Sequence, residues 1–251
     1  MQKIVQFDLG ERSYKVDLST PLDISIPLRN GKQNPNCYYA TPPSFETIHF
    51  DGFIGSVQAG GSCNYRKVTI TPHGNGTHTE CYGHITAHPK ATIDRCLKNF
   101  WFLAVLITVT PTPQEGDKLI TFEHFLEQMP KEAVEAVIIR TLPNTTEKLQ
   151  RQYSGSNPPY LVASIANWLV DHQVVHLLVD LPSVDKEVDG GVLAFHKAFW
   201  QYPTAIRVEA TITELIYVPD TVADGLYLLN LQVANIQTDA SPSRPVLYRL
   251  V

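Results

Sequence analysis

Three apolar runs, at residues 100–110, 133–140 and 174–180, constrain the fold more than any other feature of this sequence. A strand with one face in water alternates apolar and polar side chains, whereas a strand buried on both faces is apolar along its length. The most apolar run is only about half as long as the 20 residues or so that a membrane-spanning helix requires. We therefore expect three strands that are buried on both faces, and no membrane span.

Shorter patterns lie between these runs. Thr121 can cap a helix over 122–129 that stops at Pro130, and helical periodicity recurs at 164–172 and 192–200. Further strands are expected at 4–9, 14–18, 50–59, 65–71, 211–218 and 226–235. Many strands with few helices predict an α/β fold built on a large sheet. No linker rich in Pro or Gly divides residues 1–251, so we expect one domain.

Composition restricts the partners of the chain. The formal net charge is -5, so there is no basic excess for binding nucleic acid. The first ten residues lack the apolar stretch of a signal peptide. The cysteines are far apart and form no CxxC pair, which argues against disulfides and thiolate zinc sites; they are Cys37, Cys63, Cys81 and Cys96. We expect a cytoplasmic protein whose partner is a small molecule.

Four of the nine histidines lie within 16 residues, in the stretch TPHGNGTHTECYGHITAH; they are His73, His78, His84 and His88. If this stretch is extended, His78 and Glu80 point to one side. Glycines beside His73 could adopt unusual backbone angles that turn it back towards His78. Two histidines and a carboxylate can then converge on one zinc, manganese or iron ion. The alternative is an accidental surface loop.

The cluster resembles the motif of a known family. The pattern Gly76-Thr77-His78-x-Glu80-x-x-x-His84, preceded by His73, is similar to the His-x-Gly-Thr-His-x-Asp-x-Pro-x-His motif of the cyclase family. That family includes bacterial arylformamidases (kynurenine formamidases) and isatin hydrolases. Further matches follow in the family's order at 17–22, 138–141, 180–185 and 213–215. The resemblance thus extends over most of the chain.

The resemblance implies a cyclase-like fold of the swivelling β/β/α type, with a mixed, barrel-like sheet and few flanking helices. It implies that His73, His78 and Glu80 bind a first metal ion. Glu80, with His196 and Glu214, would bind a second ion or help hold the first. His84 matches the family's catalytic histidine, a general acid or base. Zinc is the expected ion and manganese the alternative, with one or two ions per chain.

Three positions depart from the motif. His73 and His78 are five residues apart instead of four, Glu80 replaces Asp, and Tyr82 replaces Pro. These changes could reshape the loop, or could leave one ion where the family has two. Glu209 is an alternative to Glu214 as the later carboxylate.

Several other side chains are open to two interpretations. Asp180 and Asp185 could orient histidine ligands, or could only satisfy a turn at a strand end. His88 and Cys81 could be further ligands, and Cys81 could instead act as a nucleophile, although a small buried cysteine is the simpler interpretation of Cys81. The substrate-binding residues are unknown; aromatic or polar candidates are Asn36, Tyr38, Tyr39 and Trp200. Ser183 lacks the Gly-x-Ser-x-Gly pattern of a serine hydrolase.

The main hypothesis is a metal-dependent hydrolase that cleaves an amide or related C–N bond, such as a formamide or a cyclic amide. A metal ion makes water a nucleophile at neutral pH, and a histidine can carry the proton. The first alternative is a metal-dependent cyclase or lyase. The second is a non-catalytic metal-binding relative. The family resemblance also implies a homodimer or a higher homo-oligomer.

Overall fold

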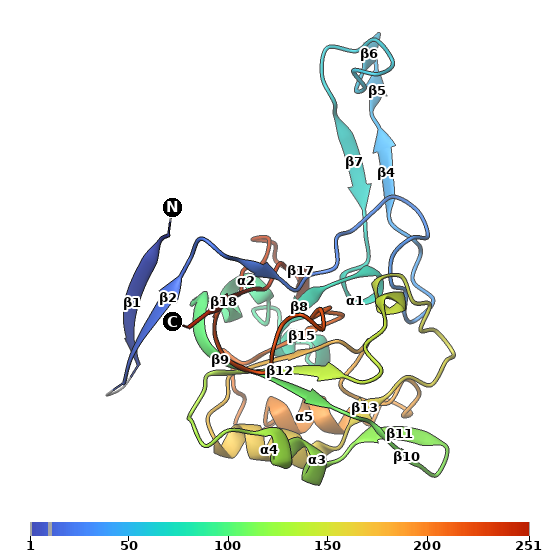
Figure 1. Ribbon diagram of the computed structural model, residues 1–251. Coiled ribbons are helices and arrows are strands. Elements are labelled where there is room, and N and C mark those ends of the chain that lie inside the picture. The colour runs from blue at the N-terminus through green and yellow to red at the C-terminus, as the bar shows by residue number, and fades with distance from the viewer. Residues whose placement is uncertain (1, 10–11, 251) are drawn as a thin grey trace.

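The computed structural model describes residues 2–9 and 12–250 and is built around a nine-stranded mixed sheet (Figure 1). The strand order is β17-β8-β15-β14-β12-β9-β16-β18-β3. The bounds, in that order, are Ala240–Pro242, His78–Glu80, Thr211–Glu214, His176–Val179, Ala136–Thr141, Trp101–Val109, Gly225–Asn230, Val246–Arg249 and Leu22–Asp23. The sheet curls around the core, as expected of a mixed, barrel-like fold.

The centre of the sheet is parallel. β12 pairs in parallel with β9 and β14, and β14 pairs in parallel with β15. Every residue of β12 and β14 is buried, and β9 is buried except near its ends. The prediction of three strands buried on both faces is therefore confirmed. Antiparallel strands complete the sheet, with β8 beside β15 and β16 beside β9.

Helices pack against one another on one face of this sheet, below it in Figure 1. They are α3 (Phe122–Gln128), α4 (Ala163–Asp171) and α5 (Ala194–Phe199). The Thr121 side chain accepts a hydrogen bond from the His124 amide and caps α3, as predicted. In α4, Ile165 and Leu169 are fully buried. The remaining helical segments are single turns: α1 (Pro72–Asn75), η1 (Tyr82–Ile85), α2 (Ile93–Cys96) and η2 (Thr146–Leu149).

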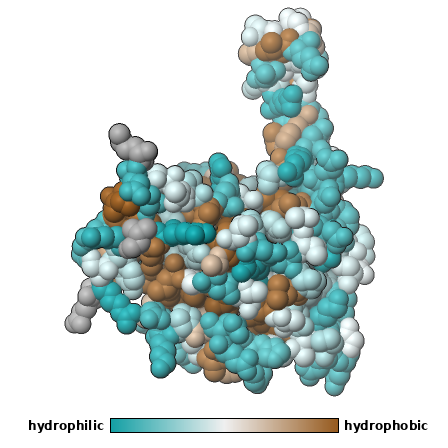
Figure 2. All heavy atoms as spheres, in the orientation of Figure 1, coloured by the Kyte–Doolittle hydropathy of each residue, from teal (hydrophilic) through white to brown (hydrophobic). Residues whose placement is uncertain are grey.

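A long arm projects from the body (Figure 1). Its strands are β4 (Ser44–Thr47), β5 (His49–Phe50), β6 (Phe53–Ile54) and β7 (Arg66–Thr69), paired as β4 with β7 and β5 with β6. The predicted continuous strand over 50–59 is wrong, because a turn interrupts it. Asp51 and Gly52 both have positive φ angles there, of 42° and 79°. Figure 2 shows hydrophobic side chains exposed on this arm.

Other strands lie at the edges of the molecule. β1 (Ile4–Leu9) and β2 (Arg12–Asp17) form an N-terminal hairpin, and a small sheet joins β10 (Thr112–Gln114), β11 (Asp117–Ile120) and β13 (Tyr160–Leu161). The predicted strands over 211–218 and 226–235 end early, at Glu214 and Asn230. β15 ends because Leu215 has a positive φ of 55°.

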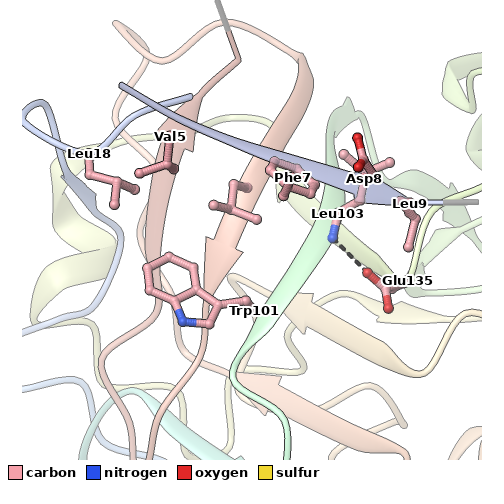
Figure 3. Close-up of a pocket in the computed structure, with 9 residues that line it drawn as sticks. Val5, Phe7, Asp8, Leu9, Leu18, Trp101, Leu103 and Glu135 are labelled. Carbon is pink, nitrogen blue, oxygen red and sulfur yellow. Dashed lines mark hydrogen bonds between the residues drawn. The ribbon is translucent and has the colours of Figure 1, made fainter. Parts of the chain in front are cut away.

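The N-terminal hairpin lines an open, mostly apolar cavity of about 390 Å³ against β9 and β16. Figure 3 shows Val5, Phe7 and Leu9 of β1 together with Trp101 and Leu103 of β9 around this space. Within the described part of the chain, none of the helices has the length and apolar character needed to cross a bilayer.

Candidate metal centre

Strand β8 places His78 and Glu80 at the centre of a side-chain cluster. β8 lies between β17 and β15, and all three of its residues are buried. Because the strand is extended, His78 and Glu80 project to the same side, as the sequence predicted. In the antiparallel register with β15, His78 faces Glu214, and His78 Nε2 lies 3.4 Å from Glu214 Oε2. The sheet itself thus brings the later carboxylate to the histidine motif.

His73 reaches the same cluster from the single turn α1. Its ring lies 5.0 Å from that of His78, centroid to centroid. The expectation that the neighbouring glycines supply unusual backbone angles is wrong. Gly76 has an extended φ of 171°, and a Cβ on Gly74 would approach Ala40 Cβ to 2.2 Å. The glycines are needed for close packing, while the helical turn directs His73 towards His78.

Glu80 is the carboxylate around which the histidines gather. Its Oε2 lies 3.2 Å from His73 Nδ1 and 3.7 Å from His84 Nδ1, and its Oε1 lies 3.0 Å from His196 Nε2. Burial alone would raise the pKa of Glu80, but the neighbouring imidazoles of His84 and His196 outweigh burial and hold that pKa well below its ordinary value. The Glu80 carboxylate is therefore ionised at neutral pH.

Two buried atoms of the cluster are unsatisfied. Among the described residues, His78 Nε2 and Glu80 Oε2 are buried without a hydrogen-bond partner. His78 Nδ1–H donates to the Gly76 carbonyl at 2.9 Å, so the lone pair of Nε2 is free to bind a cation. Buried polar atoms without partners are rare and call for an explanation such as an ion. Imidazole nitrogens and carboxylate oxygens suit zinc, manganese or iron, so these residues fit a divalent cation.

His196 comes from α5 and is held by Asp185. His196 Nδ1 lies 2.6 Å from Asp185 Oδ2, and the Asp185 carboxylate also accepts the amides of Phe195 and His196. Burial disfavours the imidazolium, yet Glu80 and Asp185 together raise the pKa of His196 to about 10. Of the two aspartates weighed from the sequence, Asp185 thus contacts a histidine. Asp180 instead pairs with Lys148 and Thr141, which matches its interpretation as a strand-end residue.

One residue of the cluster was not predicted. Asp239 Oδ2 lies 2.8 Å from His73 Nε2 and 3.5 Å from His84 Nδ1. Burial opposes the charged form of His73, but the hydrogen bond to Asp239 and the nearby carboxylate of Glu80 raise the pKa of His73 to about 10. Asp239 directly precedes β17, which pairs with β8. No pattern in the sequence around position 239 signals this contact; only the strand pairing does.

The cluster opens into a cavity of about 270 Å³. Its lining residues are Tyr38, His73, His84, Ser183, Asp185, Lys186, Glu187, Asp189, Leu193, His196 and Glu214. The six side chains predicted as ligands or catalyst are thus together: His73, His78, Glu80, His84, His196 and Glu214. Their roles as ligands and catalyst remain predictions. Glu209 lies beside a different cavity, so geometry favours Glu214 as the later carboxylate.

Of the other candidate site residues, some lie at the cavity and others do not. Tyr38 lines the cavity, whereas Tyr39 is 80% exposed. Trp200 does not reach the cavity; it is fully buried and donates its indole N–H to the Ala210 carbonyl. His88 lies exposed outside the cluster. A hydrogen bond to Cys96, together with burial, raises the pKa of the Cys81 thiol, so Cys81 is no activated nucleophile.

Comparisons with known proteins agree with this geometry. The family model described as "Putative cyclase" matches residues 16–186. A kynurenine formamidase from Bacillus cytotoxicus is 30% identical over 227 residues, covering 90% of this chain and 96% of that protein.

Two solved structures resemble this one over most of both chains. A predicted metal-dependent hydrolase from Bacillus stearothermophilus has a TM-score of 0.65 at 18% identity, covering 91% of this chain and 98% of that chain. Isatin hydrolase A from Ralstonia solanacearum has a TM-score of 0.65 at 16% identity, covering 92% of each chain. At these identities the two structures show a shared fold.

Proposed function

This chain belongs to the cyclase family, and from that premise we propose that it is a metal-dependent hydrolase of an amide or related C–N bond. The observation that carries the proposal is the buried cluster around Glu80, in which His78 Nε2 and Glu80 Oε2 lack hydrogen-bond partners among the described residues. Because similar proteins are named kynurenine formamidases, an N-formyl amide on an aromatic amine is the first substrate class to test.

The cluster supports zinc as the ion, with manganese as the alternative. His73, His78 and Glu80 would hold a first ion, and Glu80 with His196 and Glu214 would hold a second ion or complete the first site. Bound there, a divalent cation would lower the pKa of water and polarise the carbonyl that is attacked. Asp185 holds the ring of His196 by its Nδ1, so that Nε2 stays directed at Glu80.

His84 is the proposed general base and acid. Its side chain is 31% exposed and lines the cavity, so it can meet both water and substrate, unlike the fully buried His78. The imidazole would take a proton from the water that attacks the carbonyl carbon and return it to the leaving nitrogen as the C–N bond breaks. Proton transfer of this kind contributes about 10²- to 10⁴-fold to a rate.

The test is metal content per chain by elemental mass spectrometry, followed by hydrolysis of an N-formyl aniline. His78→Ala is expected to lose both metal and turnover, whereas His84→Ala is expected to keep metal and lose turnover. His88→Ala is the matched control, because His88 is exposed outside the cluster. A wild-type protein that binds no divalent metal after reconstitution would refute the proposal. Ring closure without hydrolysis would favour a cyclase or lyase.

We further propose that the chain is a homodimer or a higher homo-oligomer. The arm supports this: Phe50, Tyr65 and Val68 are each more than half exposed on a two-stranded ribbon, which is marginally stable in water alone. Light scattering would give the molar mass, and Phe50→Ser with Val68→Ser should dissociate the oligomer if the arm forms the contact.

Two smaller proposals complete the assignment. We place the protein in the cytoplasm, because all four cysteines are free and three of them are buried. We treat residues 1–251 as one cyclase-like domain, because one large hydrophobic cluster draws side chains from Ile24 to Leu247. Limited proteolysis should then release the arm before any fragment of the body.

A further inference from the structure

Two histidines of the cluster share one arrangement. Each presents one ring nitrogen to Glu80 and the other to an aspartate. His196 places Nε2 3.0 Å from Glu80 Oε1 and Nδ1 2.6 Å from Asp185 Oδ2. His73 places Nδ1 3.2 Å from Glu80 Oε2 and Nε2 2.8 Å from Asp239 Oδ2. The two rings are therefore used in opposite orientations around one carboxylate.

A carboxylate beside a ligating histidine has a defined effect. It accepts the N–H of one ring nitrogen, which fixes the tautomer and leaves the lone pair of the other nitrogen for the metal. Asp185 therefore selects the Nδ1–H form of His196. By the same geometry, we propose that Asp239 is a positioning residue that selects the Nε2–H form of His73 and leaves Nδ1 as the ligand atom. This inference rests on the proposed function, since it presumes that His73 binds a metal ion.

Asp239 differs from Asp185 in what else it contacts. Asp185 is 8% exposed and is fixed by the amides of Phe195 and His196. Asp239 is 40% exposed, and its Oδ2 also lies 3.5 Å from His84 Nδ1. Asp239 thus links a predicted ligand to the predicted general base, whereas Asp185 contacts His196 without such a link.

The backbone keeps Asp239 in this place. Its carbonyl accepts the Cys81 amide at 3.0 Å, and the next residues form β17, which pairs with β8. Asp239 therefore lies directly before β17, the strand beside β8, which carries His78 and Glu80. Because the side chain is partly exposed and its anchors are backbone groups, Asp239→Asn should leave the fold intact.

The experiment compares metal affinity, by competition with a chromophoric chelator for Zn²⁺, in the wild type and three variants. Asp239→Asn should bind Zn²⁺ about 10- to 100-fold more weakly, the usual effect of removing a carboxylate behind a ligating histidine. Asp185→Asn should show a similar loss, and Asp239→Glu should restore part of the affinity. Asp171→Asn, on the exposed end of α4, is the matched control and should bind as the wild type does.

A second measurement does not depend on any variant folding. Nitrogen-15 NMR of the Zn²⁺-loaded wild type should show His73 protonated at Nε2 and His196 protonated at Nδ1. His73 protonated at Nδ1 would overturn the inference, and so would unchanged affinity in Asp239→Asn. Cobalt substitution separates positioning from ligation: loss of one metal equivalent with an altered d–d spectrum in Asp239→Asn would make Asp239 a ligand and also overturn it.

These outcomes are distinct from failure of the proposed function. A wild type that binds Zn²⁺ and hydrolyses the formanilide, with Asp239→Asn unchanged, refutes only the positioning role. A wild type that binds no Zn²⁺ refutes the metal-dependent function and the positioning role together.

Discussion

Replacing Lys148 by methionine tests how a buried ion pair stabilises the strand ends beside the cavity. Lys148 lies in η2 and is 4% exposed. Its Nζ donates to Asp180 Oδ2 at 2.7 Å and to the Thr141 carbonyl at 2.6 Å. Thr141 ends β12, and Asp180 directly follows β14 and begins the segment that carries Ser183 and Asp185 into the cavity.

The magnitude follows from burial. Lys148→Met leaves the Asp180 carboxylate fully buried without a cation, although the amide and hydroxyl of Thr141 still donate to it at 2.8 Å. Breaking a buried ion pair from one side costs about 3–5 kcal/mol. Burial raises the pKa of Asp180 even with Lys148 beside it, so desolvation already exceeds the attraction. Replacing both partners should therefore cost less than replacing Lys148 alone.

The loss of unfolding free energy in Lys148→Met should also depend on pH. An acid whose pKa is raised on folding stabilises the fold below its unfolded pKa, about 3.9 for aspartate, and loses that contribution as the pH rises through the folded pKa. Without Lys148, the pKa of Asp180 should rise further. The deficit of the variant should thus be smallest near pH 4 and grow towards neutral pH.

Urea denaturation at several pH values measures these free energies. Lys118→Met, at an exposed position of β11, is the matched control and should change stability by less than about 0.5 kcal/mol. A loss of less than about 1 kcal/mol at pH 7 in Lys148→Met would show that Lys148 does not stabilise buried Asp180, since this loss is well below the cost of breaking a buried pair. A double variant with Asp180→Asn that is as unstable as Lys148→Met would refute the expectation that replacing both partners costs less.

Three further predictions use simpler measurements. Dialysis against a chelator should abolish hydrolysis, and Zn²⁺ at 100 times its Kd should raise the unfolding free energy of the metal-free protein by about 2.7 kcal/mol in calorimetry. Gly83→Ala should cost about 1–3 kcal/mol in urea denaturation, since its Cβ would lie 2.0 Å from the Ala91 carbonyl oxygen. It should also lower kcat, because Gly83 directly precedes His84. Ile139→Ala, in fully buried β12, should cost about 2–5 kcal/mol with an unchanged denaturant slope.

The centre of the fold could be predicted because its signal is local. A strand buried on both faces must be apolar throughout, so β9, β12 and β14 stand out in the sequence without knowledge of their partners. The amphipathic periodicity of α4 is equally local, and the buried face of the helix carries Ile165 and Leu169.

The peripheral strands could not be predicted in the same way. β17 has three residues, one of them Pro242, and exists through its pairing with β8. β18 likewise depends on β16 and β3. The strands with which β17 and β18 pair lie far away in the sequence, so no local pattern predicts β17 or β18. Asp239 could not be predicted as part of the cluster for the same reason, because 166 residues separate it from His73.

The altered spacing of the histidine motif has a structural explanation. The extra residue between His73 and His78 is absorbed by the helical turn α1, which brings the two rings to 5.0 Å. Glu80 is one methylene longer than the aspartate of the motif, and its two oxygens face different histidines, Oε2 facing His73 and Oε1 facing His196. The turn and the longer carboxylate meet at His73, since the turn carries His73 and Glu80 Oε2 lies 3.2 Å from its Nδ1. Both departures thus leave the donor atoms of His73, His78 and Glu80 within 4.8 Å of one another, a spacing that one metal ion can span.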